Sequence, residues 1–90
     1  MKIHLFATLQ MTAGRSAIDV PLGESRELMH VLVEVAGPLG EQFQTTLFDG
    51  EGTIARDVVV HVNDRIIGRG ERVVVRDVDE VTLLMPLGGG

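Results

Sequence analysis

The stretch "DVDEVTLLMPLGGG", residues 77–90, decides the fold that we expect for this chain. It alternates in the manner of a strand, because inward apolar residues are separated by outward ones such as Thr82 and Leu84. The inward set is Val81, Leu83 and Met85. Pro86 lacks a backbone donor and ends the strand, so the sequence predicts a last strand followed by a short glycine stem.

A clearer strand pattern precedes it at "DVVVHVNDR", residues 57–65. The two sides of this strand carry Val58, Val60 and Val62, against Val59 and His61. The Asn-Asp pair at 63–64 predicts a turn, and the segment around 73–75 predicts a weaker, short strand.

The start of the chain, "MKIHLFATL", also alternates like a strand. Its two sides carry Ile3, Leu5, Ala7 and Leu9, against Lys2, His4, Phe6 and Thr8. A turn around Gly14 and the strand-like "SAIDVPL" at 16–22 follow, so we expect a first hairpin.

Between these strands, residues 25–36 change to a helical period. Ser25 is the expected N-cap, and Gly37-Pro38 is the expected stop, because glycine suits the C′ position and proline does not continue a helix. We expect residues 38–56 to be irregular and anchored by their apolar side chains, namely Phe43, Leu47 and Phe48.

The resulting order is strand, strand, helix and strands again, which predicts a small α+β domain. A hairpin followed by a helix, with the last strand returning through the middle beside the first, is the ubiquitin-like β-grasp. We expect a mixed sheet of four to five strands with one main helix on one face. A split ferredoxin-like fold is the alternative, but it requires a second helix, and no second periodic stretch is present.

Length and composition agree with one domain at 1–85 and a flexible glycine tail at 86–90. The chain has 44% apolar residues and no cysteine, which excludes disulfides, thiolate metal sites and a thiol nucleophile. A net charge of −5 with scattered basic residues argues against nucleic acid and favours a basic protein partner. With no long apolar run, we expect a cytoplasmic protein without a membrane partner.

Four stretches together resemble the sulfur-carrier family of MoaD and ThiS. They are "LFATLQMTAG" at 5–14, "VHVNDRII" at 60–67, "DVDEVTLLMP" at 77–86 and the terminal glycines. The chain departs from the family pattern at Gln10-Met11 and Val78, and it ends in three glycines where the family has two. The long 40–56 segment makes it most similar to the molybdopterin synthase small subunit or to carriers for cysteine biosynthesis.

The resemblance implies a carrier that is not itself an enzyme and binds no cofactor. A ubiquitin-activating-like adenylyltransferase would use ATP to adenylate the carboxylate of Gly90, and sulfur would replace AMP to leave a thiocarboxylate. The large subunit of molybdopterin synthase, or another sulfur-accepting enzyme, would receive the sulfur. The stem that enters the partner is Pro86, Leu87, Gly88 and Gly89, and glycine suits a narrow channel because it lacks Cβ.

Alternatives to this assignment stay open in the sequence. A protein modifier joined to lysines uses the same carboxylate, and a non-covalent β-grasp interaction module would not use it at all. Which pathway receives the sulfur, whether Gly90 is trimmed, and the oligomeric state are not determined by the sequence. An independent enzyme is disfavoured, because no nucleophile–base pair or phosphate loop is present.

A partner interface is predicted on the side of the sheet that the helix leaves uncovered. Alternation places Phe6, Val59 and Leu84 there, and the resemblance assigns partner contact to Phe6, Ile66 and Leu84. The alternative is that the 43–48 segment covers part of this patch. His4 and His61 face the same side on strands expected to be neighbours, but no third ligand accompanies them, so we expect no metal site.

Overall fold

The structure is a computed structural model that describes residues 1–85, so the predicted tail at 86–90 lies outside the described residues. Within 1–85, the elements run in the order β1 (Lys2–Leu5), α1 (Ala7–Ala13), β2 (Ala17–Asp19), β3 (Arg26–Glu27), α2 (Leu28–Leu39), α3 (Glu41–Leu47), β4 (Val59–Val62), β5 (Arg65–Ile67), β6 (Val74–Val75) and β7 (Glu80–Leu84).

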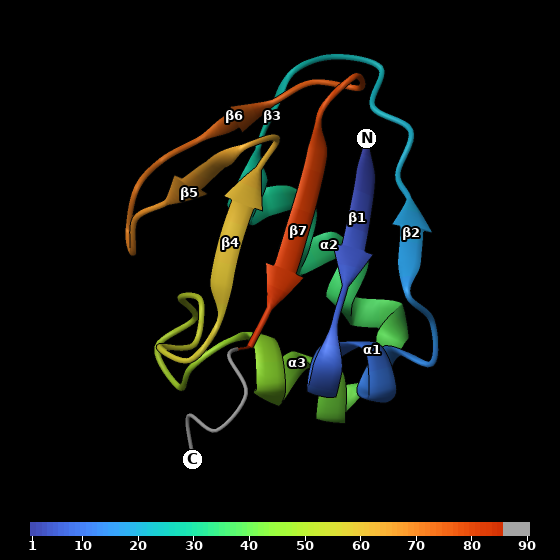
Figure 1. Ribbon diagram of the computed structural model, residues 1–90, viewed down its shortest axis with the longest axis vertical. Coiled ribbons are helices and arrows are strands. Elements are labelled where there is room, and N and C mark those ends of the chain that lie inside the picture. Colours follow the sequence, from blue (N-terminus) through green and yellow to red (C-terminus); the bar gives the residue numbers. More distant parts are fainter. Residues whose placement is uncertain (86–90) are drawn as a thin grey trace.

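Five of these strands form one mixed sheet in the order β2-β1-β7-β4-β5 (Figure 1). The last strand, β7, lies in the middle and runs parallel to β1, with Ile3 opposite Val81 and Leu5 opposite Leu83. Its other neighbour, β4, is antiparallel. The predicted ubiquitin-like β-grasp and the central position of the last strand are therefore confirmed.

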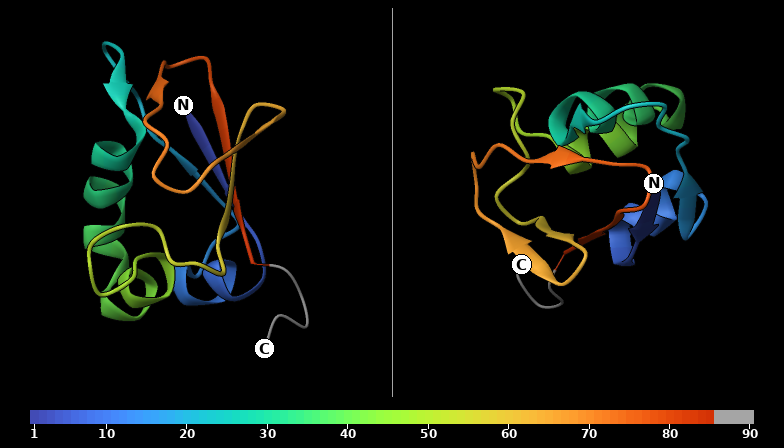
Figure 2. Two further views of the ribbon diagram at one scale, coloured as in Figure 1. Left: turned by 90° about the vertical axis from the view of Figure 1, so that its left-hand side faces the viewer. Right: turned by 90° about the horizontal axis from the view of Figure 1, so that it is seen from above.

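The helices lie on one side of the sheet and leave its other side uncovered (Figure 2). Helix α2 contributes its buried stripe to an aliphatic core between the two layers. The most deeply buried members of this core include Ile3, Leu5, Leu9, Val31, Leu32, Phe43, Leu47, Val75, Val81 and Leu83. Because β-sheet side chains alternate, every second residue of β1 and β7 enters this core and the residues between face outward.

The prediction that the first strand extends through Leu9 is wrong. Strand β1 ends at Leu5, and Ala7 takes a positive φ of 53°, which turns the chain into helix α1. The segment "ATLQMTA" is rich in good helix formers. Leu9 is the buried residue of this helix, so its apolar side chain looked like the next inward position of a strand. The helix ends at Gly14, whose φ of 75° is the left-handed conformation that glycine adopts readily.

The predicted bounds of the main helix are also wrong at both ends. Ser25 is not the N-cap, because residues 26–27 form strand β3 and the helix begins at Leu28. The helix continues past Gly37 and includes Pro38 in its last turn, ending before Gly40. A proline there removes only one late helical hydrogen bond, so the stop comes three residues after the predicted one.

Residues 41–47, expected to be irregular, form helix α3. Phe43 and Leu47 stand one helical turn apart and are both buried, so they anchor the segment as predicted but in helical form. Phe48 follows the helix, remains partly buried and pairs as an isolated bridge with Ile54. The sequence missed this helix because two anchors are too few to reveal a 3.6-residue period.

The short strand expected near residues 73–75 exists but does not join the main sheet. It is β6, which pairs antiparallel with β3 in a separate two-stranded sheet. The fifth strand of the main sheet is instead β5, which forms a hairpin with β4 through the predicted turn at 63–64.

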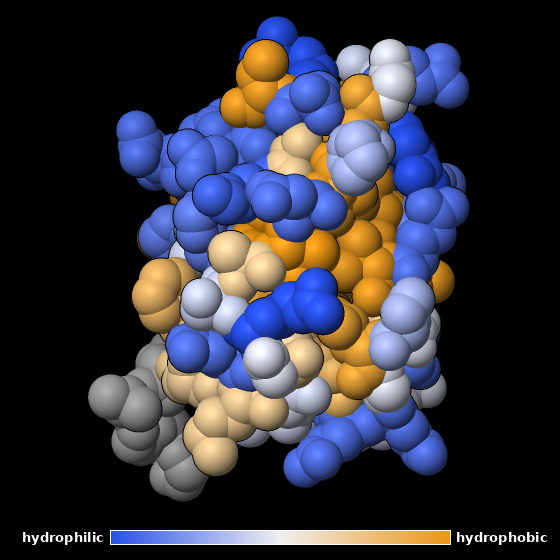
Figure 3. All heavy atoms as spheres, turned by 90° about the vertical axis from the view of Figure 1, so that its right-hand side faces the viewer, coloured by the Kyte–Doolittle hydropathy of each residue, from blue (hydrophilic) through white to orange (hydrophobic). Residues whose placement is uncertain are grey.

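The opposite edge of the sheet is formed by β2, which is only three residues long. Viewed from that side, the surface shows an apolar area with hydrophilic residues on both sides of it (Figure 3). The partly buried Ile18 and Val20 pack against the core there.

Candidate functional site

The uncovered face carries an apolar row at the end of the sheet where β7 finishes. Val59 of β4 stands directly opposite Leu84 of β7. Phe6 follows β1 on the other side of β7, and its backbone N–H donates to the carbonyl of Leu83 at 3.2 Å. Phe6 is 50% exposed, whereas Val59 and Leu84 are half-buried. The structure therefore brings these three predicted residues side by side, in the order Phe6, Leu84, Val59.

Ile66 extends this row diagonally. It pairs with His61 on β4, which places it two positions along from Val59 on the same side, within reach of long side chains. Ile66 is 63% exposed. The 43–48 segment does not cover Phe6 or Ile66, which stay exposed, because its anchors Phe43 and Leu47 are buried in the core. We call Phe6, Val59, Ile66 and Leu84 the apolar row.

The two histidines of this face are not on neighbouring strands, which corrects the sequence-based expectation. Strand β7 separates them, and Thr82 lies opposite both His4 and His61. His4 instead bonds Glu80, with 2.8 Å between Nε2 and Oε1. Within residues 1–85 no group of three His, Cys, Asp or Glu side chains is placed to hold a metal ion.

The acidic turn before β7 has a structural task that sequence reasoning missed. The Asp79 carboxylate is buried, accepts the backbone N–H of Arg76 at 2.7 Å and accepts Nδ2 of Asn63 at 3.2 Å. These hydrogen bonds, the Arg76 N–H first, lower the pKa of Asp79. Asp77 accepts the backbone N–H of Leu22 and the amino group of Met1, which lower its pKa as well. The turn thus secures the start of the central strand.

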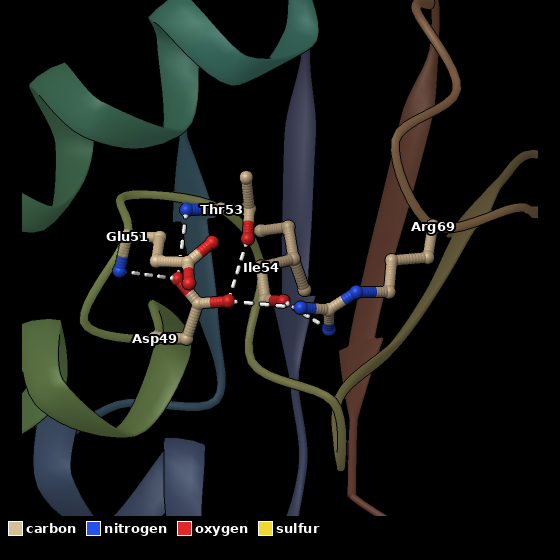
Figure 4. A network of polar contacts seen from close by, with 5 residues as sticks. All are labelled: Asp49, Glu51, Thr53, Ile54 and Arg69. Atoms are coloured by element: carbon tan, nitrogen blue, oxygen red, sulfur yellow. Dashed lines mark hydrogen bonds and ion pairs between the residues drawn. The ribbon is translucent and has the colours of Figure 1, made fainter.

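A second polar network lies away from the apolar row, in the loop after α3 (Figure 4). The Asp49 carboxylate accepts the Thr53 hydroxyl at 2.6 Å and the backbone N–H groups of Glu51 and Thr53. Arg69 reaches across to bond Asp49 at 2.9 Å and the carbonyl of Ile54 at 3.0 Å. The Thr53 hydroxyl is the main cause that lowers the pKa of Asp49 to about 2.

This network forms one wall of a pocket of about 260 Å³ between α2 and the loops at 53–56 and 68–73. Its lining is mainly aliphatic, with Leu28 and Leu32 from α2 and Ile67 from β5. The pocket opens between the sheet and α2, on the covered side, so it is separate from the apolar row. Among the described residues, no helix is long and apolar enough to cross a membrane.

The apolar row lies next to the point where the described residues end. Strand β7 is held on both sides, and its final residue, Leu84, is a member of the apolar row. Met85 is partly buried against the core, and "PLGGG" follows it. The predicted acyl site at Gly90 and the stem residues Pro86, Leu87, Gly88 and Gly89 lie outside the described residues, so these assignments stay predictions.

Comparison with known proteins agrees with the geometry. The chain is similar to the crystal structure of SAMP1 from Haloferax volcanii, with 24% identity and a TM-score of 0.82 over 100% of this chain and 98% of that one. It is also similar to H. volcanii small archaeal modifier protein 1 (23%, 0.76, over 97% of each chain) and to Sulfolobus solfataricus Urm1 (15%, 0.70, over 96% and 100%). At these identities the likeness shows the fold alone.

Among curated proteins, none matches the chain. The family model described as the ThiS family matches residues 3–90, which is nearly the whole sequence. A match of that extent, on a β-grasp whose central last strand leads into a glycine-rich end, identifies the family. The chain belongs to the ThiS family.

Proposed function

We propose that this chain is a sulfur carrier that is not itself catalytic. A partner enzyme adenylates the Gly90 carboxylate with ATP, and sulfur then displaces AMP to form a thiocarboxylate. In this proposal the acceptor enzyme is the large subunit of molybdopterin synthase. ATP belongs to the activating partner, and the carrier binds no cofactor of its own.

The single observation that carries the proposal is the position of the apolar row at the end of β7. A partner that docks on Phe6, Leu84 and Val59 holds the strand from which residues 86–90 depart. Binding energy from the row is then available to place a slim, uncharged stem in a narrow channel. Glycine suits such a stem, because a residue without Cβ tolerates close walls and unusual φ values.

Intact mass spectrometry tests the proposal directly. The chain is incubated with its copurifying activating enzyme, ATP and a sulfur donor, and we expect the mass change of one oxygen exchanged for sulfur, localised to Gly90. A variant with one alanine after Gly90 keeps the folded domain and should show no exchange. A variant that lacks Gly90 determines whether Gly89 can serve as the acyl residue. If the extended variant is converted as well as the parent, the carboxylate of Gly90 is not the reactive group.

A second function is favoured by one of the solved neighbours, which is named a modifier protein. The same activated carboxylate would then form an amide with a lysine of a target protein, and no sulfur would be transferred. Conjugates that survive reducing, denaturing electrophoresis and vanish in the extended variant would support this function. A copurifying pyridoxal-phosphate enzyme would instead point to sulfur delivery for cysteine biosynthesis.

A further inference from the structure

The sequence contains one lysine, Lys2, and its other basic residues are all arginines. The proposed activation turns the C-terminal carboxylate into an acyl group that reacts with neutral primary amines. A chain with one lysine therefore has few groups that can accept it. An arginine guanidinium remains protonated in proteins and does not compete as a nucleophile. The only primary amines in the sequence are therefore the ε-amine of Lys2 and the α-amine of Met1.

In the folded protein the α-amine of Met1 is hydrogen-bonded and is not available as a nucleophile. It donates to the carbonyl of Val20 at 2.8 Å and to Oδ1 of Asp77 at 3.1 Å. The Met1 side chain is fully buried, and the same Asp77 oxygen accepts the backbone N–H of Leu22 at 2.9 Å. Acylation would break both bonds of the amine and place a chain of glycines against the sheet, so the folded protein protects this group.

Lys2 has the opposite environment. It is exposed and, by the alternation of β1, faces the uncovered side together with His4. The residues directly opposite it on the two neighbouring strands are Asp19 on β2 and Glu80 on β7, both exposed. Lys2 thus stands at the start of the central pair of strands, about 13 Å along β1 from Phe6 at roughly 3.3 Å per residue.

We propose that Lys2 is the acceptor site through which a second copy of this chain is attached by its C-terminal glycine. The inference rests on the proposed activation of Gly90. The neutral amine of Lys2 attacks the carbonyl carbon of the acyl-adenylate of another copy. A C–N bond forms, the C–O bond to the phosphate breaks, AMP leaves with the bonding electrons, and one proton passes to solvent.

Strand geometry favours a bond between two copies over one within a single copy. Lys2 lies level with Glu80, so Met85 is about 16 Å farther along the sheet at roughly 3.3 Å per residue. The five residues after Met85 span at most about 18 Å when fully extended. A bond within one copy is within that reach once the Lys2 side chain is included, but it would lay the stem back over the uncovered face, out of reach of an activating partner.

A bond between copies leaves the apolar row free. The donor end departs beside Leu84, and the acceptor stands at the other end of the same strands, so the linkage is head-to-tail. Repetition of a head-to-tail contact gives an open chain and not a closed dimer. Each added copy would keep the surface that its activating partner needs.

The experiment uses the full chain with its copurifying activating enzyme and ATP. Covalent dimers are expected on reducing, denaturing gels, and Lys2→Arg should reduce them at least tenfold while leaving ATP-dependent adenylation of Gly90 unchanged. Trypsin should yield one branched peptide, residues 77–90 joined to Lys2 within residues 1–15. Dimers that persist in Lys2→Arg, or a branch at Met1 or at a hydroxyl group, would overturn the proposal. So would the absence of dimers from a wild-type chain whose Gly90 is adenylated.

A second arm separates this inference from the proposed function. Brief treatment with an acetyl succinimidyl ester should acetylate Lys2 and spare Met1, and denaturation should expose both amines. A Lys2→Arg chain carrying a preformed C-terminal thioester, which has no acceptor lysine of its own, is then mixed with wild-type or Lys2→Arg acceptor. A dimer only with the wild-type acceptor supports Lys2 even where the enzyme fails to adenylate Gly90. Equal reaction of both acceptors counts against Lys2, whatever the enzyme does.

Discussion

Asn63 and Asp79 clasp the β4–β5 turn to the start of the central strand, with Nδ2 of Asn63 donating to Oδ1 of Asp79 at 3.2 Å. The backbone of Glu80 completes the clasp, because its N–H donates to Oδ1 of Asn63 and its carbonyl accepts the N–H of Asn63. Asn63 has a positive φ of 55°, which asparagine tolerates better than most residues. The clasp thus fixes where β7 begins.

Replacement of the buried member of this clasp should destabilise the domain. Asp79→Ala leaves the Arg76 N–H and the Asn63 amide without their partner, at a cost of about 1–3 kcal/mol. For a domain of this size each kcal/mol lost lowers Tm by roughly 4–8 °C. Thermal and urea unfolding measure the change, with Asp64→Ala in the same exposed turn as the control. Equal Tm values for the two variants would show that the clasp contributes nothing.

Acid should loosen the loop after α3 before it affects the core. The pKa of Asp49 is lowered from 3.8 to about 2, so its contribution to stability is complete above about pH 4 and is lost as the pH falls toward 2. Asp49→Asn should therefore flatten the dependence of Tm on pH in this window. Glu51→Gln is the matched control, since Asp49 uses only the backbone N–H of Glu51. An unchanged slope in Asp49→Asn would contradict the assignment.

Relief of the positive φ at Ala7 should stabilise the chain. A residue with Cβ in this left-handed region costs roughly 1–2 kcal/mol, and glycine avoids most of that cost. Ala7→Gly should raise the free energy of unfolding by a few tenths to about 1 kcal/mol, after the entropy lost by glycine. Ala13→Gly, in the same helix, should lower it by about 1 kcal/mol. A destabilising Ala7→Gly would mean that the turn is not strained.

The apolar row should govern partner affinity without governing the fold. Ile66→Asp places a charge in the row and should weaken binding to the copurifying activating partner at least tenfold, or about 1.4 kcal/mol. Val74→Asp is a matched control, because Val74 is 64% exposed and Ile66 is 63% exposed, but Val74 lies on β6 outside the main sheet. Titration calorimetry compares the two. Similar losses in both variants would remove the row from the interface.

The alternating strands were the part of the fold that the sequence could predict. The alternation predicts Val81 and Leu83 inward and Leu84 outward, and the burial of these residues agrees. The helices α1 and α3 could not be predicted, because each buries only one or two side chains and so leaves no periodic record. The same limit applies to β3 and β6, which are two residues long and form strands only because they pair with each other.

The sequence by itself determined the period of each long strand, the central helix and the glycine-rich end, since these depend on local side-chain spacing and on residues without Cβ or backbone donors. Only the tertiary structure decided that β7 separates His4 from His61. It also decided that Phe6, Leu84 and Val59 meet in one row. It decided, too, that the α-amine of Met1 is buried and hydrogen-bonded while Lys2 is exposed. Those relationships depend on strand order and register, which arise from contacts between residues far apart in the chain.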